Sequence, residues 1–220
     1  MNVRLVLVPA IALIAAGIVW YSQTDAVPAA TWRTGTGADV KQGRNWDELP
    51  AETKVRLSFR CDSSRYVYVF SHSQTDGTLL LFPSPEVMSD LTQPLAAGHS
   101  VLPGARDGNE LAWTTRAEVL PSTTFLVVAA KERVPELEAL LPKLRRWSNR
   151  ALTSGLMAVT AIKDAEVVSG PGQPLPDALL QRAAELSLRT DLVNGPLTPD
   201  TARPDTWLGS WRIKELATPK

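Results

Sequence analysis

Apolar and polar residues alternate strictly along residues 54–61, where every second residue from Val55 to Cys61 is apolar. A period of two is typical of a strand with one face in a core and the other in water. The next apolar segment, residues 65–71, is apolar on both faces near its middle, which favours a central strand. The pattern therefore predicts a half-buried strand followed by a more deeply buried one.

Turn residues divide the following stretch into further short strands. Asp76-Gly77 is typical of a hairpin turn, and Pro83 ends the strand that follows it. The predicted strands after the hairpin occupy residues 78–82, 99–102, 111–115 and 124–131. Short strands separated by regular turn signals predict a β sandwich or an open barrel.

Beyond residue 131 the period changes to helical spacing. The apolar positions from Val134 to Trp147 predict a helix, which Pro142 kinks or splits because proline lacks a backbone donor. Three further elements are predicted downstream. Residues 156–168 favour a strand, with a helix as the alternative; residues 174–186 predict a helix, and residues 206–216 a final strand, which we expect at an edge of the sheet. The fold class is thus α+β, a mostly antiparallel sandwich or open barrel with C-terminal helices packed on it.

The first residues have the layout of an export signal. A single basic residue, Arg4, precedes an uncharged block from Leu5 to Trp20. A helix of that length spans about 24 Å, less than the ~30 Å hydrocarbon core, which favours a signal peptide (residues 1–29) cleaved after Ala29. An uncleaved membrane anchor is the alternative, and both place the rest of the chain outside the cytoplasm.

The remainder divides into an arm and one globular domain. Residues 30–53 are rich in Thr, Gly, Ala and Pro, so we expect a flexible arm. Residues 54–220 are predicted to form a single domain, with its β core over 54–131 and a helical and β part over 132–220.

Composition excludes several classes of protein. Hydrophobic residues make up 44% and charged residues 21%, which is ordinary for a globular protein. The 23 basic and 23 acidic residues balance, so no electrostatic footprint for nucleic acid is expected. The single cysteine, Cys61, excludes an intramolecular disulfide and a multi-cysteine zinc site. We expect no cofactor and no metal.

An ordered set of motifs over residues 54–131 resembles the bacterial domain of unknown function 4384 family. The set comprises an alternating strand, an aromatic strand, a hairpin, a Leu-Phe-Pro end and a final aliphatic strand. In this chain its characteristic elements are Tyr66-Val67-Tyr68-Val69-Phe70, Asp76-Gly77, Leu81-Phe82-Pro83, Ala97-Gly98, Leu102-Pro103 and 125–130. The resemblance implies a compact β domain of the kind attached to bacterial kinases, caspase-like proteases or membrane anchors, with no functional residues to carry over.

Aromatic residues are the first candidates for a binding site. Tyr66, Tyr68 and Phe70 share one strand face, which serves either as a sandwich core or as a recognition platform. Exposed tryptophans would suit a small ligand or a glycan, and the candidates for that role are Trp113, Trp207 and Trp211.

The long segment 83–110 is a second candidate, because long loops often carry function. A hydrolase site there would use His99 with Ser100 or Asp107. The chain has no Gly-x-Ser-x-Gly motif, and Cys61 ends the apolar face of its strand, which favours a buried thiol.

These features favour a non-catalytic, exported cell-envelope module that binds another envelope protein. It would be periplasmic, secreted or anchored in the inner membrane, with membrane contact only through residues 5–21 when uncleaved. The alternatives are an envelope hydrolase with a site in 83–110 and a small-ligand or glycan binder. The candidate binding residues are Tyr66, Tyr68, Trp113 and His99.

Overall fold

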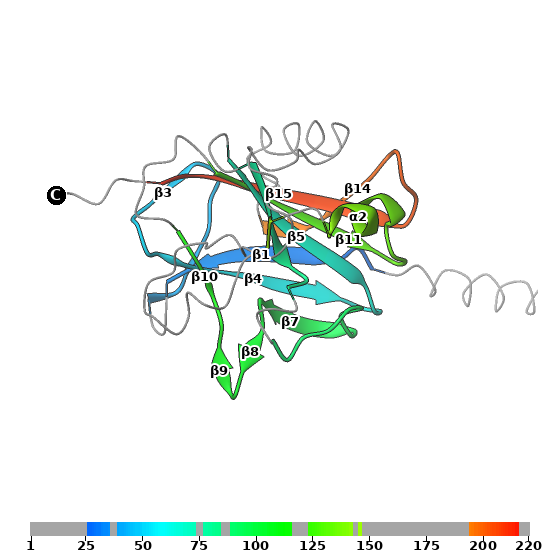
Figure 1. The fold of residues 1–220 in the computed structure, drawn as a ribbon, viewed down its shortest axis with the longest axis horizontal. Helices are drawn as coiled ribbons and strands as arrows, with labels where there is room; N and C mark the ends of the chain where they lie inside the picture. The colour runs from blue at the N-terminus through cyan, green and yellow to red at the C-terminus, as the bar shows by residue number, and fades with distance from the viewer. Residues whose placement is uncertain are drawn as a thin grey trace, which may run out of the picture.

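The computed structural model describes residues 26–35, 39–73, 77–84, 89–115, 123–142, 145–146 and 194–215. The fold is rich in β-structure, and two sheets lie against each other in it (Figure 1). We call the sheet that contains β1, β4 and β7 sheet A, and the sheet that contains β5, β11 and β15 sheet B. In Figure 1 sheet A forms the lower layer and sheet B the upper one.

Sheet A is antiparallel and has β4 (Lys54–Cys61) at its centre. Its neighbours are β1 (Ala29–Thr34) on one side and β7 (Gly98–Leu102) on the other. Shorter strands complete the sheet: β10 (Trp113–Thr114) beside β4, and β2 (Lys41–Gln42) and β13 (Asn194–Pro196) beside β1. The strict alternation in residues 54–61 thus belongs to a central strand with one buried face.

Sheet B has β5 (Tyr66–Ser73), β11 (Thr123–Ala130) and β15 (Thr206–Glu215) as its long neighbouring strands. Flanking strands are β6 (Gly77–Phe82), β12 (Arg145–Arg146), β14 (Thr198–Pro199) and β3 (Asp47–Leu49). β12 and β3 run parallel to their partners, and the other pairs are antiparallel. A separate hairpin, β8 (Ala105–Arg106) and β9 (Asn109–Glu110), extends below β7 in Figure 1.

The main core lies between the two sheets and is built around Trp32. Its indole lies 4.9 Å from Phe125, 5.2 Å from Trp211 and 6.1 Å from Trp113, measured between ring centroids. Trp32 is 1% exposed, so β1 contributes one of the largest buried side chains of the described fold. Such aromatic contacts add to the free energy that the burial of their area supplies.

A second core lies on the opposite face of sheet B, under the helix α2 (Pro135–Leu140). Leu137 of α2 packs there with apolar side chains of the sheet: Tyr68, Phe70, Leu80, Leu126, Val128 and Leu208. Sheet B is therefore apolar on both faces, as the sequence of residues 65–71 predicted.

The predicted strands of the central region are confirmed with small shifts at their ends. The segments 54–61, 65–71, 78–82, 99–102 and 124–131 correspond to β4, β5, β6, β7 and β11, and 111–115 is reduced to β10. The hairpin between β5 and β6 is also confirmed as an antiparallel pair.

The prediction of a flexible arm over residues 30–53 is wrong. β1 pairs with β4 along six residues. β2 pairs with β1 in sheet A, and β3 pairs with β15 in sheet B. The small residues of this stretch favoured a flexible segment in the sequence analysis. In the structure, Ala30 and Trp32 are the apolar side chains with which β1 packs into the core. The β core therefore begins at β1 and ends at β15.

Two C-terminal predictions also need correction. The final strand, β15, does not lie at a free edge, because β14 and β3 pair with the side that faces away from β11. The helix predicted from Val134 to Trp147 ends at Leu140, and Arg145–Arg146 runs as a strand beside β6. Pro142 explains the early end, since proline has no backbone N–H to donate to the carbonyl of Glu138, four residues before it.

Residues 1–25, which contain the apolar block, lie outside the described residues, and so do the segments 156–168 and 174–186. Among the residues that are described, no helix has the length and hydropathy needed to cross a membrane.

Candidate functional site

A cleft of about 320 Å³ lies beside α2, between the end of β6 and the segment 89–93. Its lining includes the apolar side chains of Leu81, Phe82, Leu91, Pro103 and Leu141. Polar side chains also reach the cleft: Ser84, Ser89, Thr92, Gln93, Arg133 and Glu138. Part of its wall comes from the segment 83–110, which the sequence analysis predicted as a candidate functional loop.

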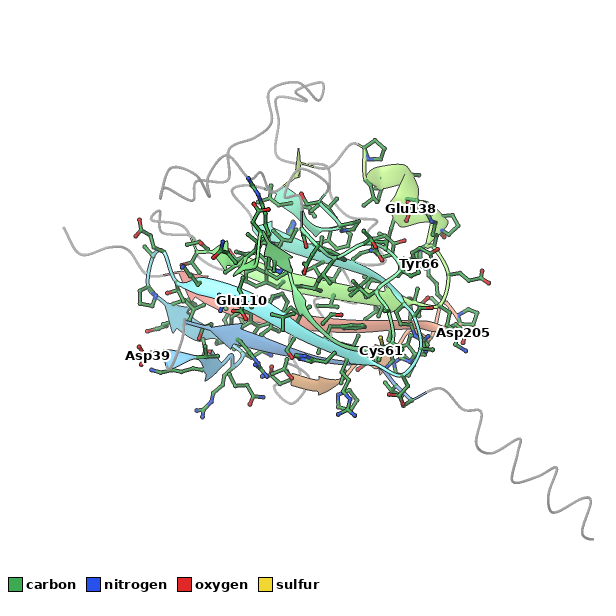
Figure 2. The ribbon with its side chains drawn as sticks, turned by 90° about the horizontal axis from the view of Figure 1, so that it is seen from below. Asp39, Cys61, Tyr66, Glu110, Glu138 and Asp205 are labelled. Carbon is green, nitrogen blue, oxygen red and sulfur yellow. The ribbon has the colours of Figure 1, made fainter. Side chains whose placement is uncertain are left out.

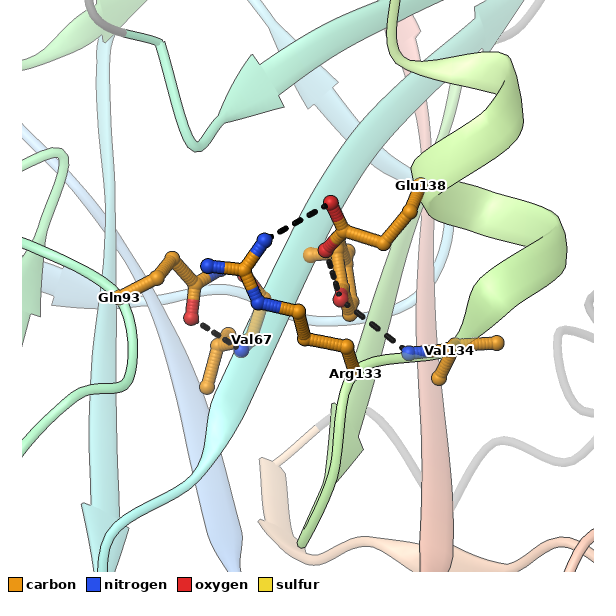
Figure 3. A network of polar contacts seen from close by, with 6 residues as sticks. Val67, Gln93, Arg133, Val134 and Glu138 are labelled. Carbon is orange, nitrogen blue, oxygen red and sulfur yellow. Dashed lines mark hydrogen bonds and ion pairs between the residues drawn. The ribbon is translucent and has the colours of Figure 1, made fainter.

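One wall of the cleft is fixed by a hydrogen-bond network around Glu138 (Figure 3). The Tyr68 hydroxyl donates to Oε1 of Glu138 at 2.6 Å, and the same hydroxyl accepts from the Val134 amide at 3.4 Å. Burial, together with the hydrogen bond to Glu138, raises the pKa of Tyr68 well above its ordinary value. Tyr68 is therefore a neutral donor that holds the start of α2 on sheet B.

Arg133 completes this wall on the solvent side. Its Nη1 lies 3.6 Å from Oε2 of Glu138, and its guanidinium lies 5.5 Å from the ring centre of Tyr66. Contacts with the Tyr66 phenol and with Glu138 raise the pKa of Arg133. Its side chain is 64% exposed, so the guanidinium is oriented by two partners and still open to a ligand.

The opposite wall is held by the Gln93 side-chain amide, which bonds to the backbone of β5 as a neighbouring strand would. Gln93 accepts from the Val67 amide at 2.9 Å and donates to the Val67 carbonyl, so both backbone groups of Val67 are satisfied (Figure 3). This pair ties the segment 89–93 to β5 and fixes the width of the cleft.

The strand that borders the cleft has a backbone edge without a paired strand. Within the described residues, β12 pairs with Leu79 and Leu80 of β6, and no strand continues this pairing along Leu81 and Phe82. The register between β5 and β6 shifts between Val69 and Phe70, near the same point. An extended segment of another chain could add to this edge, which is a common way to recognise peptides.

Of the predicted binding residues, Tyr66 lies next to this wall, half-buried under Arg133. Tyr68 is fully buried, and its face points away from sheet A, so it belongs to the second core and not to the core between the sheets. The tryptophans proposed for a glycan site are buried as well: Trp113 is 2%, Trp207 8% and Trp211 0% exposed. The expectation that they form an exposed platform is therefore wrong, because all three are used in packing.

His99 lies elsewhere, exposed on β7. Its Nε2 is 2.6 Å from Oγ of Ser58, a residue that sequence reasoning did not select. The outward position of Ser58 in the alternating strand was the available signal. Neither predicted partner has a described contact with His99: Ser100 follows it on β7, and Asp107 pairs with Arg106 at 3.5 Å in the β8–β9 turn.

The other titratable groups that are buried serve the fold. Burial raises the pKa of Cys61, whose Sγ donates to the Ala96 carbonyl at 3.6 Å, and burial lowers the pKa of His72. In the described part of the chain, no three His, Cys, Asp or Glu side chains gather as a metal site would require.

The functional residues that sequence reasoning missed are Gln93, Arg133 and Glu138. Each lies within three residues of a proline, Pro94 or Pro135, and none belongs to a motif. No protein-family model, curated protein or solved structure matches this chain.

Proposed function

We propose that this chain is an exported cell-envelope module that binds an extended segment of another envelope protein in the cleft beside α2. The observation that carries the proposal is the meeting of an apolar cleft and the edge of β6 at Leu81 and Phe82, along which no described strand continues the pairing of β12. An apolar floor with a few oriented polar groups is typical of binding sites.

The dimensions favour a peptide segment as the ligand. The volume of about 320 Å³ lies near the lower end of ligand pockets, which suits one or two apolar side chains. Backbone groups of Leu81 and Phe82 can bond to an extended partner, while the floor selects its side chains.

The polar groups around the floor would set the orientation of the segment. Glu138 and Arg133 place opposite charges side by side, and Glu138 is fixed by Tyr68. A partner that offers a carboxylate to Arg133 would compete with Glu138 or share the guanidinium with it, since arginine has five donors.

Two sequence features support the cellular setting of this proposal. The uncharged block from Leu5 to Trp20 after a single arginine has the layout of an export segment. The resemblance of residues 54–131 to the domain of unknown function 4384 family, which stays a prediction, supports a bacterial module that works with other proteins.

Site-specific photo-cross-linking in cells tests the proposal. A photoreactive residue replaces Thr92, which is exposed and lines the cleft, and a control replaces Asn109, which is exposed on β9. We expect one envelope protein to be captured from Thr92 and not from Asn109, and mass spectrometry then gives the captured segment.

A synthetic peptide of the captured segment is then titrated against the full-length chain. We expect Leu141→Glu to weaken binding by at least about tenfold, because it places a charge in an apolar cleft. The matched control is Val40→Glu, which adds the same charge at a residue 39% exposed and outside the cleft lining. Equal affinity of the wild type and Leu141→Glu would refute the proposal, as would equal capture from both cross-linking positions.

A further inference from the structure

The outer face of sheet A carries a row of basic side chains. In β4 the residues from Val55 to Cys61 at odd numbers are buried in the core, so the intervening ones point away from sheet B. The outward residues of β4 are Lys54, Arg56, Ser58 and Arg60. Three of the four are cationic: Lys54 and Arg56 are about 7 Å apart along the strand, and Arg60 is about 13 Å beyond Arg56.

The neighbouring strands place two more side chains beside this row. Arg33 of β1 lies directly opposite Arg56, and His99 of β7 lies directly opposite Arg60. Directly opposed residues of antiparallel strands have their Cβ atoms only about 5 Å apart on the same face. We define the basic face as Arg33, Lys54, Arg56, Arg60 and His99.

The protein neutralises little of this charge itself. Arg56 lies 3.4 Å from Glu110, which is beside β4 in Figure 2, and its Nε donates to the Leu111 carbonyl at 3.0 Å. Arg33, Lys54 and Arg60 are exposed, and within the described residues they make no ion pair or side-chain hydrogen bond. Like charges that face each other across strands are unfavourable, so an anionic partner would relieve the repulsion.

The position where β1 begins indicates what kind of anionic partner the basic face would meet. β1, the strand that carries Arg33, begins at Ala29, and Ala29 lies opposite Arg60. Only seven residues, 22–28, separate Ala29 from Tyr21, which directly follows the apolar block, a reach of at most about 25 Å. An apolar block embedded in a bilayer would therefore hold the basic face near the lipid headgroups.

The pairing of β1 also favours retention of the residues that precede it. Ala29 pairs with Arg60 and with Pro196, and the Pro28 carbonyl accepts from the Leu197 amide at 2.7 Å. Cleavage after Ala29 would remove both residues from the edge of the sheet.

We propose that the basic face of sheet A docks on the phosphate groups of an anionic membrane surface, close to the point where the chain leaves the bilayer. Juxtamembrane basic residues are attracted to anionic lipids over about one Debye length. The docked face is separate from the cleft beside α2, whose lining shares no residue with it.

The test uses the full-length chain reconstituted into vesicles that contain a headgroup-labelled quencher lipid. A fluorophore is attached at Thr31→Cys on the outer face of β1, or at Glu136→Cys on α2 as the control position; native Cys61 is buried and remains unlabelled. Vesicles of phosphatidylcholine alone are compared with vesicles that also contain phosphatidylglycerol.

Anionic lipid is expected to raise quenching at position 31 by about threefold or more and to leave position 136 unchanged. The increase should vanish at about 1 M salt, where the Debye length falls to about 3 Å. It should also vanish in Arg33→Gln with Arg60→Gln. It should persist in the matched pair Lys131→Gln with Lys214→Gln, whose lysines lie directly after β11 and on β15.

Equal quenching in both kinds of vesicle would overturn the proposal, as would an equal loss in the two double variants. Tight binding of soluble polyglutamate without lipid-dependent quenching would assign the face to an acidic protein instead. Unfolding of each variant in urea verifies that it remains folded.

Discussion

The two sheets of this molecule use their outer faces in opposite ways. On sheet B, β5 and β11 are buried on both faces, because α2 and its apolar cluster cover the outer side. On sheet A, the outward residues of β4 are basic or hydroxylic: Lys54 and Arg60 are exposed, Arg56 is partly covered and Ser58 is buried. The difference indicates that sheet B is a structural centre and that sheet A has a surface left for contacts.

The same contrast separates the two proposed sites. The cleft lies at an edge of sheet B, where the outer helix ends and the described pairing of β12 with β6 stops at Leu80. The basic face lies across sheet A, where no apolar cluster of the described residues covers the strands. One module can therefore meet a membrane with one layer and a partner protein with the other.

The largest expected effect comes from placing a negative charge on the outer face of each sheet and comparing the changes in the free energy of unfolding. Val128 is fully buried on the outer side of sheet B, so Val128→Asp should cost several kcal/mol, because an unpaired buried carboxylate is poorly compensated. Against a typical stability of 5–15 kcal/mol, much of the protein would unfold. Urea unfolding monitored by tryptophan fluorescence measures the loss.

The control for that prediction is Arg60→Asp, on the exposed outer side of sheet A. Its effect should stay within about 0.5 kcal/mol, as is usual for surface substitutions. Similar losses in the two variants would mean that the outer faces do not differ as described.

A second test addresses the core that the two sheets share. Trp32→Ala should lower the free energy of unfolding by about 3–5 kcal/mol, because Trp32 contacts three other aromatic rings between the sheets. Trp46→Ala is the matched control: this indole is 41% exposed and stacks on Arg212 at 4.8 Å, so we expect less than about 1 kcal/mol. A loss for Trp46→Ala as large as for Trp32→Ala would contradict the assignment.

A third test concerns the polar link between sheet B and α2. Tyr68→Phe removes the hydrogen bond to Glu138 and should cost about 1–2 kcal/mol at neutral pH, while Tyr66→Phe should cost less. Because the pKa of Tyr68 is raised in the folded protein, the folded state holds this proton more tightly than the unfolded state does. The stabilisation is complete below the ordinary tyrosine pKa and is lost as the pH rises above about 10.

The measurement is a pair of urea titrations at pH 8 and above pH 10 for the wild type and Tyr68→Phe. The difference between the two proteins should shrink at the higher pH. A difference that stays constant would show that the hydroxyl does not titrate in the link.

Sequence pattern was sufficient for the strands whose burial is decided by their own residues. The alternation in β4 and the apolar runs of β5 and β11 predicted strands at nearly the observed positions, because side-chain period reports directly on which faces are buried. The sequence pattern did not predict β1, because β1 is held in the sheet mainly by its pairing with β4 and its own composition shows little apolar signal.

The hydrophobic pattern of the sequence did not predict the candidate site, for a different reason. Gln93, Arg133 and Glu138 meet only because β5, the segment 89–93 and α2 pack together. Sequence placed Tyr68 correctly on one strand face, yet which of the two faces of sheet B it occupied depended on the position of sheet A. Contacts of this kind arise from tertiary packing, which a local period does not contain.

The smallest expected effect tests the repulsion on the basic face. Arg33→Glu replaces a like-charge pair with an opposite-charge pair across from Arg56, so it should raise the free energy of unfolding by about 0.2–1 kcal/mol at low salt. Because exposed charges are screened, the gain should fade at about 1 M salt. Arg106→Glu, in the β8–β9 hairpin and away from the cross-strand pair, should bring no such salt-dependent gain. A gain for Arg33→Glu that survives high salt would point to packing, and the basic face would then carry no electrostatic strain for an anionic membrane to relieve.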